Sequence, residues 1–139
     1  MIATIVVVGT GILAGVYTAL STMVLPALRQ ESAREATATM TRINSRAERG
    51  PFIVLFGGTA VAAVVLGVSG LLRGSASDVL IAGASLSGTA VTVLRNVPLN
   101  RGLDRGGAGE WSRYQRSWTR WNSCRALLSI AAVVLATRS

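Results

Sequence analysis

Residues 94–125 concentrate side chains that bind charge and aromatic rings. The stretch reads LRNVPLNRGLDRGGAGEWSRYQRSWTRWNSCR, and it holds all three tryptophans and half of the fourteen arginines. The sequence on either side is almost uncharged. Guanidinium, amide and indole groups gathered in one place can bind the oxygen atoms and the flat faces of a small molecule.

A helix over residues 111–129 would place six of these side chains on one face, at 100° per residue. The six are Trp111, Tyr114, Trp118, Trp121, Asn122 and Arg125. Arg125 lies about 14 residues from the end of the chain, which is roughly 20 Å along a helix. An arginine at that depth in a bilayer is costly, so it normally faces protein or a watery cavity.

The apolar run before this segment ends in hydroxyl and amide groups. Thr89 and Thr92 share one helical face, and Asn96 extends that face by one turn. Because Pro98 disfavours helical geometry at Val97, we expect the chain to turn there. The turn would collect a polar, aromatic-lined recess, which is the general form of a small-molecule site. Its expected members are Asn96, Asn100, Tyr114, Asn122 and Arg125.

The same residues also have simpler explanations. Tryptophan and tyrosine at a bilayer surface are commonly anchors, so the tryptophans are either anchors or cavity walls. The depth of Arg125 favours a buried network or a functional role. Cys124 we interpret as apolar filler. The other arginines we interpret as solvated or lipid-facing charges, namely Arg101, Arg105, Arg113, Arg116 and Arg120.

The elements that position these residues are predicted to be transmembrane helices. The chain has 139 residues, of which half are hydrophobic and 14% are charged, whereas soluble domains carry about 25% charged residues. We predict an all-α fold, a four-helix transmembrane bundle forming one domain over 1–139. Spans of about 20 residues cross a bilayer. The predicted spans are 2–25, 51–72, 77–96 and 115–137.

Two charged joints connect these spans. Residues 29–49 have apolar side chains at helical spacing, which predicts an amphipathic helix at the membrane surface or an extension of the first span. Residues 95–120 form the joint rich in arginine and tryptophan. The two joints, with Arg125, hold twelve of the fourteen arginines. Positive charge stays in the cytoplasm, so we predict a multi-pass protein of the cell membrane with both termini outside.

Composition excludes several functions. There is no histidine, one cysteine and six scattered acids, which argues against haem, histidine-bound zinc and carboxylate metal clusters. No cofactor and no metal are therefore expected. Arginine is confined to the joints, so membrane lipids are the expected partners rather than nucleic acid. Small residues such as Gly11 and Gly15 allow close helix contacts and leave a homo-oligomer open.

The motifs RNVPLN and WSRYQRSWTRWNSCR resemble those of the anthrone oxygenase family of small four-helix membrane proteins. The pattern has a small-residue helix ending in proline, matched by Gly15 and Pro26. It then has an asparagine-x-proline-x-asparagine motif after helix three, matched by Asn96, Pro98 and Asn100. Helix four opens with tryptophan, asparagine and arginine, matched by Trp118 or Trp121, Asn122 and Arg125.

The resemblance implies a cofactor-independent oxygenase that converts anthrone-type polyketides into quinones. Arg125 with Asn96 or Asn122 would then stabilise an oxyanion, and the tryptophans would stack on a hydrophobic aromatic substrate. The general base is not evident, although Glu110 or a water held by Tyr114 is a candidate. The alternative is a non-catalytic membrane protein that binds a lipid or hydrophobic metabolite, or assists a membrane partner.

Overall fold

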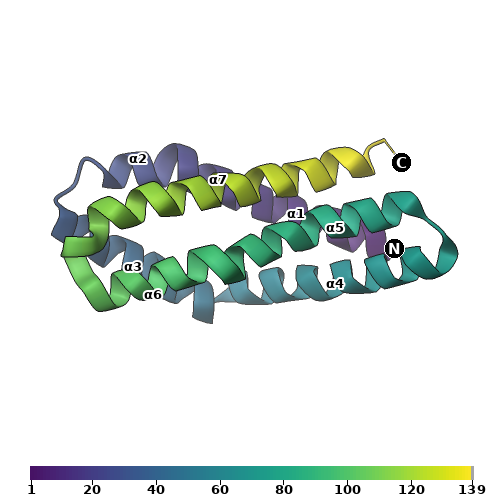
Figure 1. The fold of residues 1–139 in the computed structure, drawn as a ribbon, viewed down its shortest axis with the longest axis horizontal. Coiled ribbons are helices and arrows are strands. Elements are labelled where there is room, and N and C mark those ends of the chain that lie inside the picture. Colours follow the sequence, from purple (N-terminus) through teal and green to yellow (C-terminus); the bar gives the residue numbers. More distant parts are fainter. Residues whose placement is uncertain (139) are drawn as a thin grey trace.

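The computed structural model describes residues 1–138, and helices account for nearly all of that range (Figure 1). The α-helices are α1 (Ile2–Ala19), α2 (Leu25–Leu28), α3 (Ala33–Arg49), α4 (Pro51–Arg73), α5 (Ala76–Val91), α6 (Val97–Gly106) and α7 (Trp111–Ala136). Two π-helical segments, Leu20–Val24 and Thr92–Asn96, join α1 to α2 and α5 to α6. A short 3₁₀ turn, Gly107–Glu110, precedes α7.

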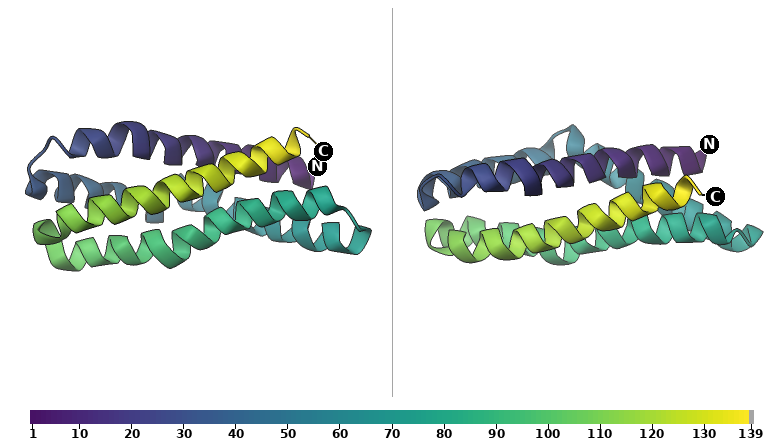
Figure 2. Two further views of the ribbon diagram at one scale, coloured as in Figure 1. Left: turned by 45° about the horizontal axis from the view of Figure 1, so that its top comes forward. Right: turned by 90° about the horizontal axis from the view of Figure 1, so that it is seen from above.

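These helices form four antiparallel rods, and the expected all-α four-helix bundle is confirmed. The first rod is α1 with α2, the second is α3 followed by α4, the third is α5 with α6, and the fourth is α7 (Figures 1 and 2). An even number of antiparallel rods brings both termini to the same end of the bundle (Figure 2).

The bundle has an apolar half and a polar half along its length. Three helical stretches of the described chain are long and apolar enough to cross a membrane: Ile2–Leu28, Pro51–Arg73 and Ala76–Ala136, the last of which includes the turn before α7. Most exposed large hydrophobic side chains lie on α1, α4, α5 and the second part of α7. These exposed apolar side chains lie in the half of the bundle that holds both termini, which we call the apolar half. The polar half consists of residues 25–49 and 97–120.

The turn expected near Val97 does not occur, because the helix continues through Pro98 by widening locally into a π-helical segment. Proline lacks an N–H and its ring crowds the carbonyl four residues earlier. Here the Val97 N–H donates to the carbonyl of Thr92, five residues back, and this wider π turn accommodates the proline. The third rod therefore continues to Gly106. The chain reverses at Gly107, whose φ of +64° favours glycine, and α7 starts at Trp111 rather than near Tyr114.

Pro26 is accommodated in the same way. The Leu25 N–H donates to the carbonyl of Leu20, so a π-helical segment again precedes the proline. The first rod bends there but continues to Leu28, as expected for a proline that either ends or bends the span.

Helix α3 turns back and packs its apolar face into the bundle, so it does not extend the first span. Its start is fixed by a capping box, in which the Ser32 hydroxyl accepts from the Glu35 N–H and the Glu35 carboxylate accepts from Ser32. The hydrogen bonds from the Ser32 hydroxyl and N–H lower the pKa of the Glu35 carboxyl. The apolar residues Ala36 and Met40 are completely buried against Leu25 and α7.

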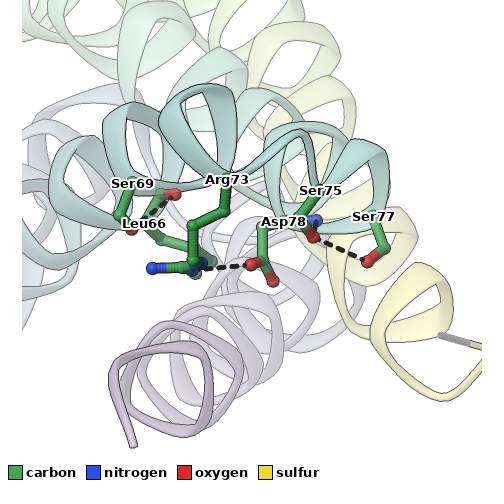
Figure 3. Close-up of polar contacts among 6 residues, drawn as sticks. All are labelled: Leu66, Ser69, Arg73, Ser75, Ser77 and Asp78. Carbon is green, nitrogen blue, oxygen red and sulfur yellow. Dashed lines mark hydrogen bonds and ion pairs between the residues drawn. The ribbon is translucent and has the colours of Figure 1, made fainter.

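At the opposite end, a tight turn joins α4 to α5. Gly74 takes the left-handed conformation with φ of +70° and ends α4. The Ser75 hydroxyl then accepts from the Asp78 N–H and caps α5, while Arg73 and Asp78 form an ion pair of 3.0 Å across the turn (Figure 3). The turn holds the second and third rods in antiparallel contact.

Close packing between the first two rods depends on Gly9. A Cβ at Gly9 would overlap the Oγ1 of Thr59 on α4. Gly15, in contrast, is exposed, and nothing lies within 4 Å of the position that a Cβ would occupy there. Of these two glycines, Gly9 therefore lies at a helix contact that needs a small residue, whereas Gly15 faces outward.

We predict that Gly9→Val destabilises the protein by about 1–3 kcal/mol, because the added side chain forces α1 away from α4. The measurement is the thermal unfolding midpoint of the purified protein in detergent. Gly15→Val adds the same atoms to open space and serves as the control. Equal midpoints for the two variants would contradict the packing described here.

Candidate functional site

Arg125 lies in the interior of the bundle, with 5% of its surface exposed. Its Nε and Nη2 atoms donate to the Asn122 Oδ1 at 3.0 and 2.7 Å, and its Nη1 donates to the Thr92 Oγ1 at 3.0 Å. Within the described residues, no carboxylate forms an ion pair with it. Arg125 is thus a buried cation held by an amide and a hydroxyl group, without a counter-charge.

Two aromatic rings flank the guanidinium of Arg125. The ring centroid of Tyr17 on α1 is 4.0 Å from its central carbon, and the ring centroid of Trp118 is 5.3 Å away. A ring face attracts a cation, and the attraction reaches about 2 kcal/mol where water is excluded. The rings therefore compensate part of the desolvation cost without neutralising the charge.

Asn122 orients Arg125 and connects α7 to the first rod. This side chain is fully buried, and its Nδ2 donates to the backbone carbonyl of Tyr17 at 2.7 Å and to the Ser21 Oγ at 2.6 Å. Both Nδ2 contacts leave the Oδ1 pointing at Arg125 as an acceptor. The predicted pair Asn122 and Arg125 therefore acts as one hydrogen-bonded unit.

Asn96 is buried without hydrogen-bond partners. Its exposed fraction is 1%, and neither its Oδ1 nor its Nδ2 bonds to another described residue. An unsatisfied buried polar group costs about 1–3 kcal/mol. Buried amides in folded proteins almost always have partners, so an exception points to a ligand-binding role.

A cavity of about 340 Å³ joins these groups, which is within the size range of small-molecule sites. It lies between the first rod, the junction of α3 and α4, the π-helical segment before Pro98, and α7. Its polar lining includes Asn44, Glu48, Thr92, Asn96, Asn100 and Arg125. Its apolar lining includes Phe52, Phe56, Trp118 and several aliphatic side chains.

Hydrogen bonds fix the orientation of Trp118, one wall of the cavity. The Asn100 Oδ1 accepts from the Trp118 Nε1 at 2.8 Å and from the Tyr114 hydroxyl at 3.0 Å. The Asn44 Nδ2 donates to that same hydroxyl at 3.4 Å. Trp118 and Tyr114 are buried, so neither is a surface anchor. Asn100 therefore both lines the cavity and fixes the position of the Trp118 ring.

Two predicted site residues lie elsewhere. Trp121 does not line this cavity, and its ring centroid is 4.7 Å from the guanidinium carbon of Arg95, on another side of α7. Thr89 donates to the carbonyl of Ser85 at 3.4 Å, within its own helix. The structure thus groups Arg125, Asn96, Thr92, Asn100 and Trp118 around one space. Asn122 is bonded to Arg125 but does not line the cavity, and Tyr114 lies directly behind its wall.

Several residues of the site did not emerge from the sequence. They include Tyr17, Asn44, Arg46, Glu48, Phe52 and Phe56. Asn44 follows Met40 by one helical turn and so falls on the buried face of α3, which was a usable signal. Tyr17 gave none. Glu48 is an exposed residue that lines the cavity from the last turn of α3.

Glu48 is the carboxylate that lines the cavity within the described residues. Glu110, the base considered from the sequence, lines a different hollow and lies 3.9 Å from Arg113. Among residues 1–138, no group of three histidine, cysteine, aspartate or glutamate residues is placed to hold a metal ion.

One comparison with known proteins identifies a family. The family model described as anthrone oxygenase matches residues 43–135, which include the end of α3, all of α4 to α6 and almost all of α7. No curated protein and no solved structure matches the chain. Tyr17 and Ser21, which contact the Arg125–Asn122 pair, lie outside the matched residues.

We predict that Asn122→Ala destabilises the protein by about 1–3 kcal/mol, because Arg125 loses two acceptor contacts while it stays buried. The readout is the thermal unfolding midpoint in detergent. Cys124→Ala, two residues away and only partly buried, is the control and is expected to unfold near the wild-type temperature. A midpoint for Asn122→Ala equal to that of Cys124→Ala would show that the pair contributes nothing to stability.

Proposed function

Because the chain belongs to the anthrone oxygenase family, we propose that it is a cofactor-independent oxygenase acting on a flat, phenolic, polyketide-type substrate. The observation that carries the proposal is the buried Arg125 cation, which faces an aromatic-walled cavity without a carboxylate partner among the described residues. Such a cation favours a ligand in which negative charge sits on oxygen.

The proposed reaction oxidises a CH₂ group opposite a ring carbonyl. Removal of one CH₂ proton gives an enolate, whose electron-rich carbon reacts with O₂ and becomes a hydroperoxide. Loss of the second hydrogen as a proton breaks the O–O bond and releases hydroxide, which becomes water. The balance is CH₂ plus O₂ giving C=O plus H₂O, and O₂ is the oxidant.

Arg125 and Asn96 are the proposed oxyanion donors. Fixed donors in a site that excludes water stabilise charge as it develops on oxygen, and they need no reorganisation during the reaction. Arg125 already faces the cavity, while the Nδ2 of Asn96 has no other acceptor among the described residues. Asn122 and Thr92 act through Arg125 as positioning residues, since both accept hydrogen bonds from its guanidinium.

Glu48 is the proposed general base. It lines the same cavity as Arg125 and Asn96 and is also exposed, so a proton taken from the substrate can pass on to solvent. A positioned base contributes about 10²–10⁴-fold to the rate of such a proton transfer. Phe52, Phe56 and Trp118 provide flat apolar walls against which aromatic rings pack.

We further propose that the polar half lies in the cytoplasm and both termini lie outside the cell membrane, because arginines concentrate in the polar half. The substrate would then enter from the cytoplasmic side. A reporter enzyme that works only outside the cytoplasm is expected to be active when it is fused to either terminus. Activity of a cytoplasmic reporter at the same positions would reverse the orientation.

We predict that Arg125→Ala lowers oxygen uptake with an anthrone substrate by about 10²–10³-fold, the usual cost of losing an oxyanion donor. The assay compares membranes with matched amounts of protein, corrected for spontaneous oxidation. Arg125→Lys keeps the charge but loses the planar fork of donors, so it is expected to stay well below wild type. Oxygen uptake by wild-type membranes no higher than that of empty membranes would contradict oxygenase activity on this substrate class. It would favour the alternative, a non-catalytic protein that binds such ligands or assists a partner.

We predict that Glu48→Ala lowers the rate by at least about 10²-fold and that added acetate restores part of it, because the cavity is open beside Glu48. Glu110→Ala is the matched control and is expected to retain wild-type uptake. Full activity of Glu48→Ala, alongside an inactive Arg125→Ala, would assign proton removal to another group.

A further inference from the structure

A second hollow on the surface of the polar half is lined by four arginines. Arg113, Arg116 and Arg120 come from the first turns of α7, and Arg29 comes from the end of the first rod. Arg29 is held across the hollow, because its Nε donates to Gln115 at 3.0 Å and its Nη2 donates to Thr119 at 3.3 Å. The hollow has a volume of about 470 Å³ and is separate from the cavity of Arg125.

The positive charge in this hollow is largely uncompensated. Residues three and four apart on a helix are neighbours, so Arg113, Arg116 and Arg120 repel one another. Glu110 approaches Arg113 at 3.9 Å, but among residues 1–138 no carboxylate pairs with Arg29, Arg116 or Arg120. Arginine presents a planar fork of donors that matches phosphate oxygens. The chemistry of the hollow therefore suits a phosphate-bearing anion.

The face of α7 continues from this hollow into the apolar half. Residues spaced by three or four follow one stripe along the helix. After Arg120 the stripe passes through Cys124, which lines a smaller hollow together with Ser117 and Arg120, and then through Leu127, which is 67% exposed. Arg120 and Leu127 are seven residues apart, or roughly 10 Å along the axis.

We propose that this stripe binds one anionic phospholipid. Arg29, Arg116 and Arg120 bind the head-group phosphate, the hollow at Ser117 and Cys124 takes the glycerol region, and an acyl chain lies along Leu127 toward Val134. The change from cationic to apolar side chains along one helix face follows the order of groups in a phospholipid. A free phosphate would use only the cationic end of this stripe.

The test measures lipid retention by the full-length protein in detergent, with native mass spectrometry and thermal unfolding. The probes are phosphatidylglycerol and phosphatidylcholine with identical acyl chains. Wild type is expected to keep one phosphatidylglycerol per chain in preference to phosphatidylcholine and to unfold at a higher temperature with it. The variant Arg116→Gln/Arg120→Gln is expected to bind phosphatidylglycerol at least tenfold more weakly.

The control is Arg34→Gln/Arg42→Gln, which removes the same charge from α3 and is expected to bind like wild type. Equal binding by the two double variants would overturn the site, because affinity would then depend only on net charge. Arg116→Lys/Arg120→Lys keeps the charge, and its affinity for phosphatidylglycerol is expected to lie between those of wild type and the glutamine variant. This lysine variant tests the site even if the glutamine variant does not fold. Displacement of the lipid by equimolar inorganic phosphate or glycerol phosphate would assign the hollow to a free anion.

Discussion

The burial of the Arg125 charge without a counter-charge among the described residues is the constraint on which the centre of this structure depends. Transfer of a cation from water into the bundle is unfavourable unless other groups replace its hydration. Here the replacement consists of the Asn122 amide, the Thr92 hydroxyl and the ring faces of Tyr17 and Trp118. None of these carries a negative charge, so the site keeps its affinity for an anionic oxygen.

The π-helical segments help to explain why there is space beside this charge. Each one precedes a proline and widens the helix, in the first rod before Pro26 and in the third rod before Pro98. Leu20 and Asn96 belong to these segments and both line the cavity. The junction of α3 and α4 at Gly50 also borders the cavity, which Glu48 and Pro51 line from either side of it. Single-turn π segments frequently occur at functional sites, and here they replace regular packing with a lined cavity.

The sequence predicts the features of this site that depend on one helix. Asn122 and Arg125 are three residues apart on α7, so helical spacing alone places them together with Trp118. Asn96 and Asn100 were correctly expected at the same level of the bundle, although for an incorrect reason, since the local effect of Pro98 predicted a turn. The π-helical segment depends on tertiary packing, which the rule for residues before proline does not include.

The contributions of α1 and α3 could not be predicted in the same way. Tyr17 lies in an uncharged span whose many apolar residues give no sign of which face meets α7. Asn44 and Glu48 belong to α3, and their positions depend on α3 folding back into the bundle rather than extending the first span. The packing of α3 against the bundle depends on long-range contacts, and periodicity within a single helix does not contain them.

The most direct test of the central claim is the ionisation state of a bound phenolic ligand. A dihydroxyanthraquinone resembles the proposed product, is not oxidised further at the reacting carbon, and changes its visible absorption when a phenol loses its proton. We expect the purified protein to bind it and to shift its spectrum to that of the anion at a pH where it is neutral in solution, and we expect Arg125→Ala to abolish the shift. Binding of the neutral form, or an identical shift with Arg125→Ala, would contradict the role of Arg125 as the partner of an oxyanion.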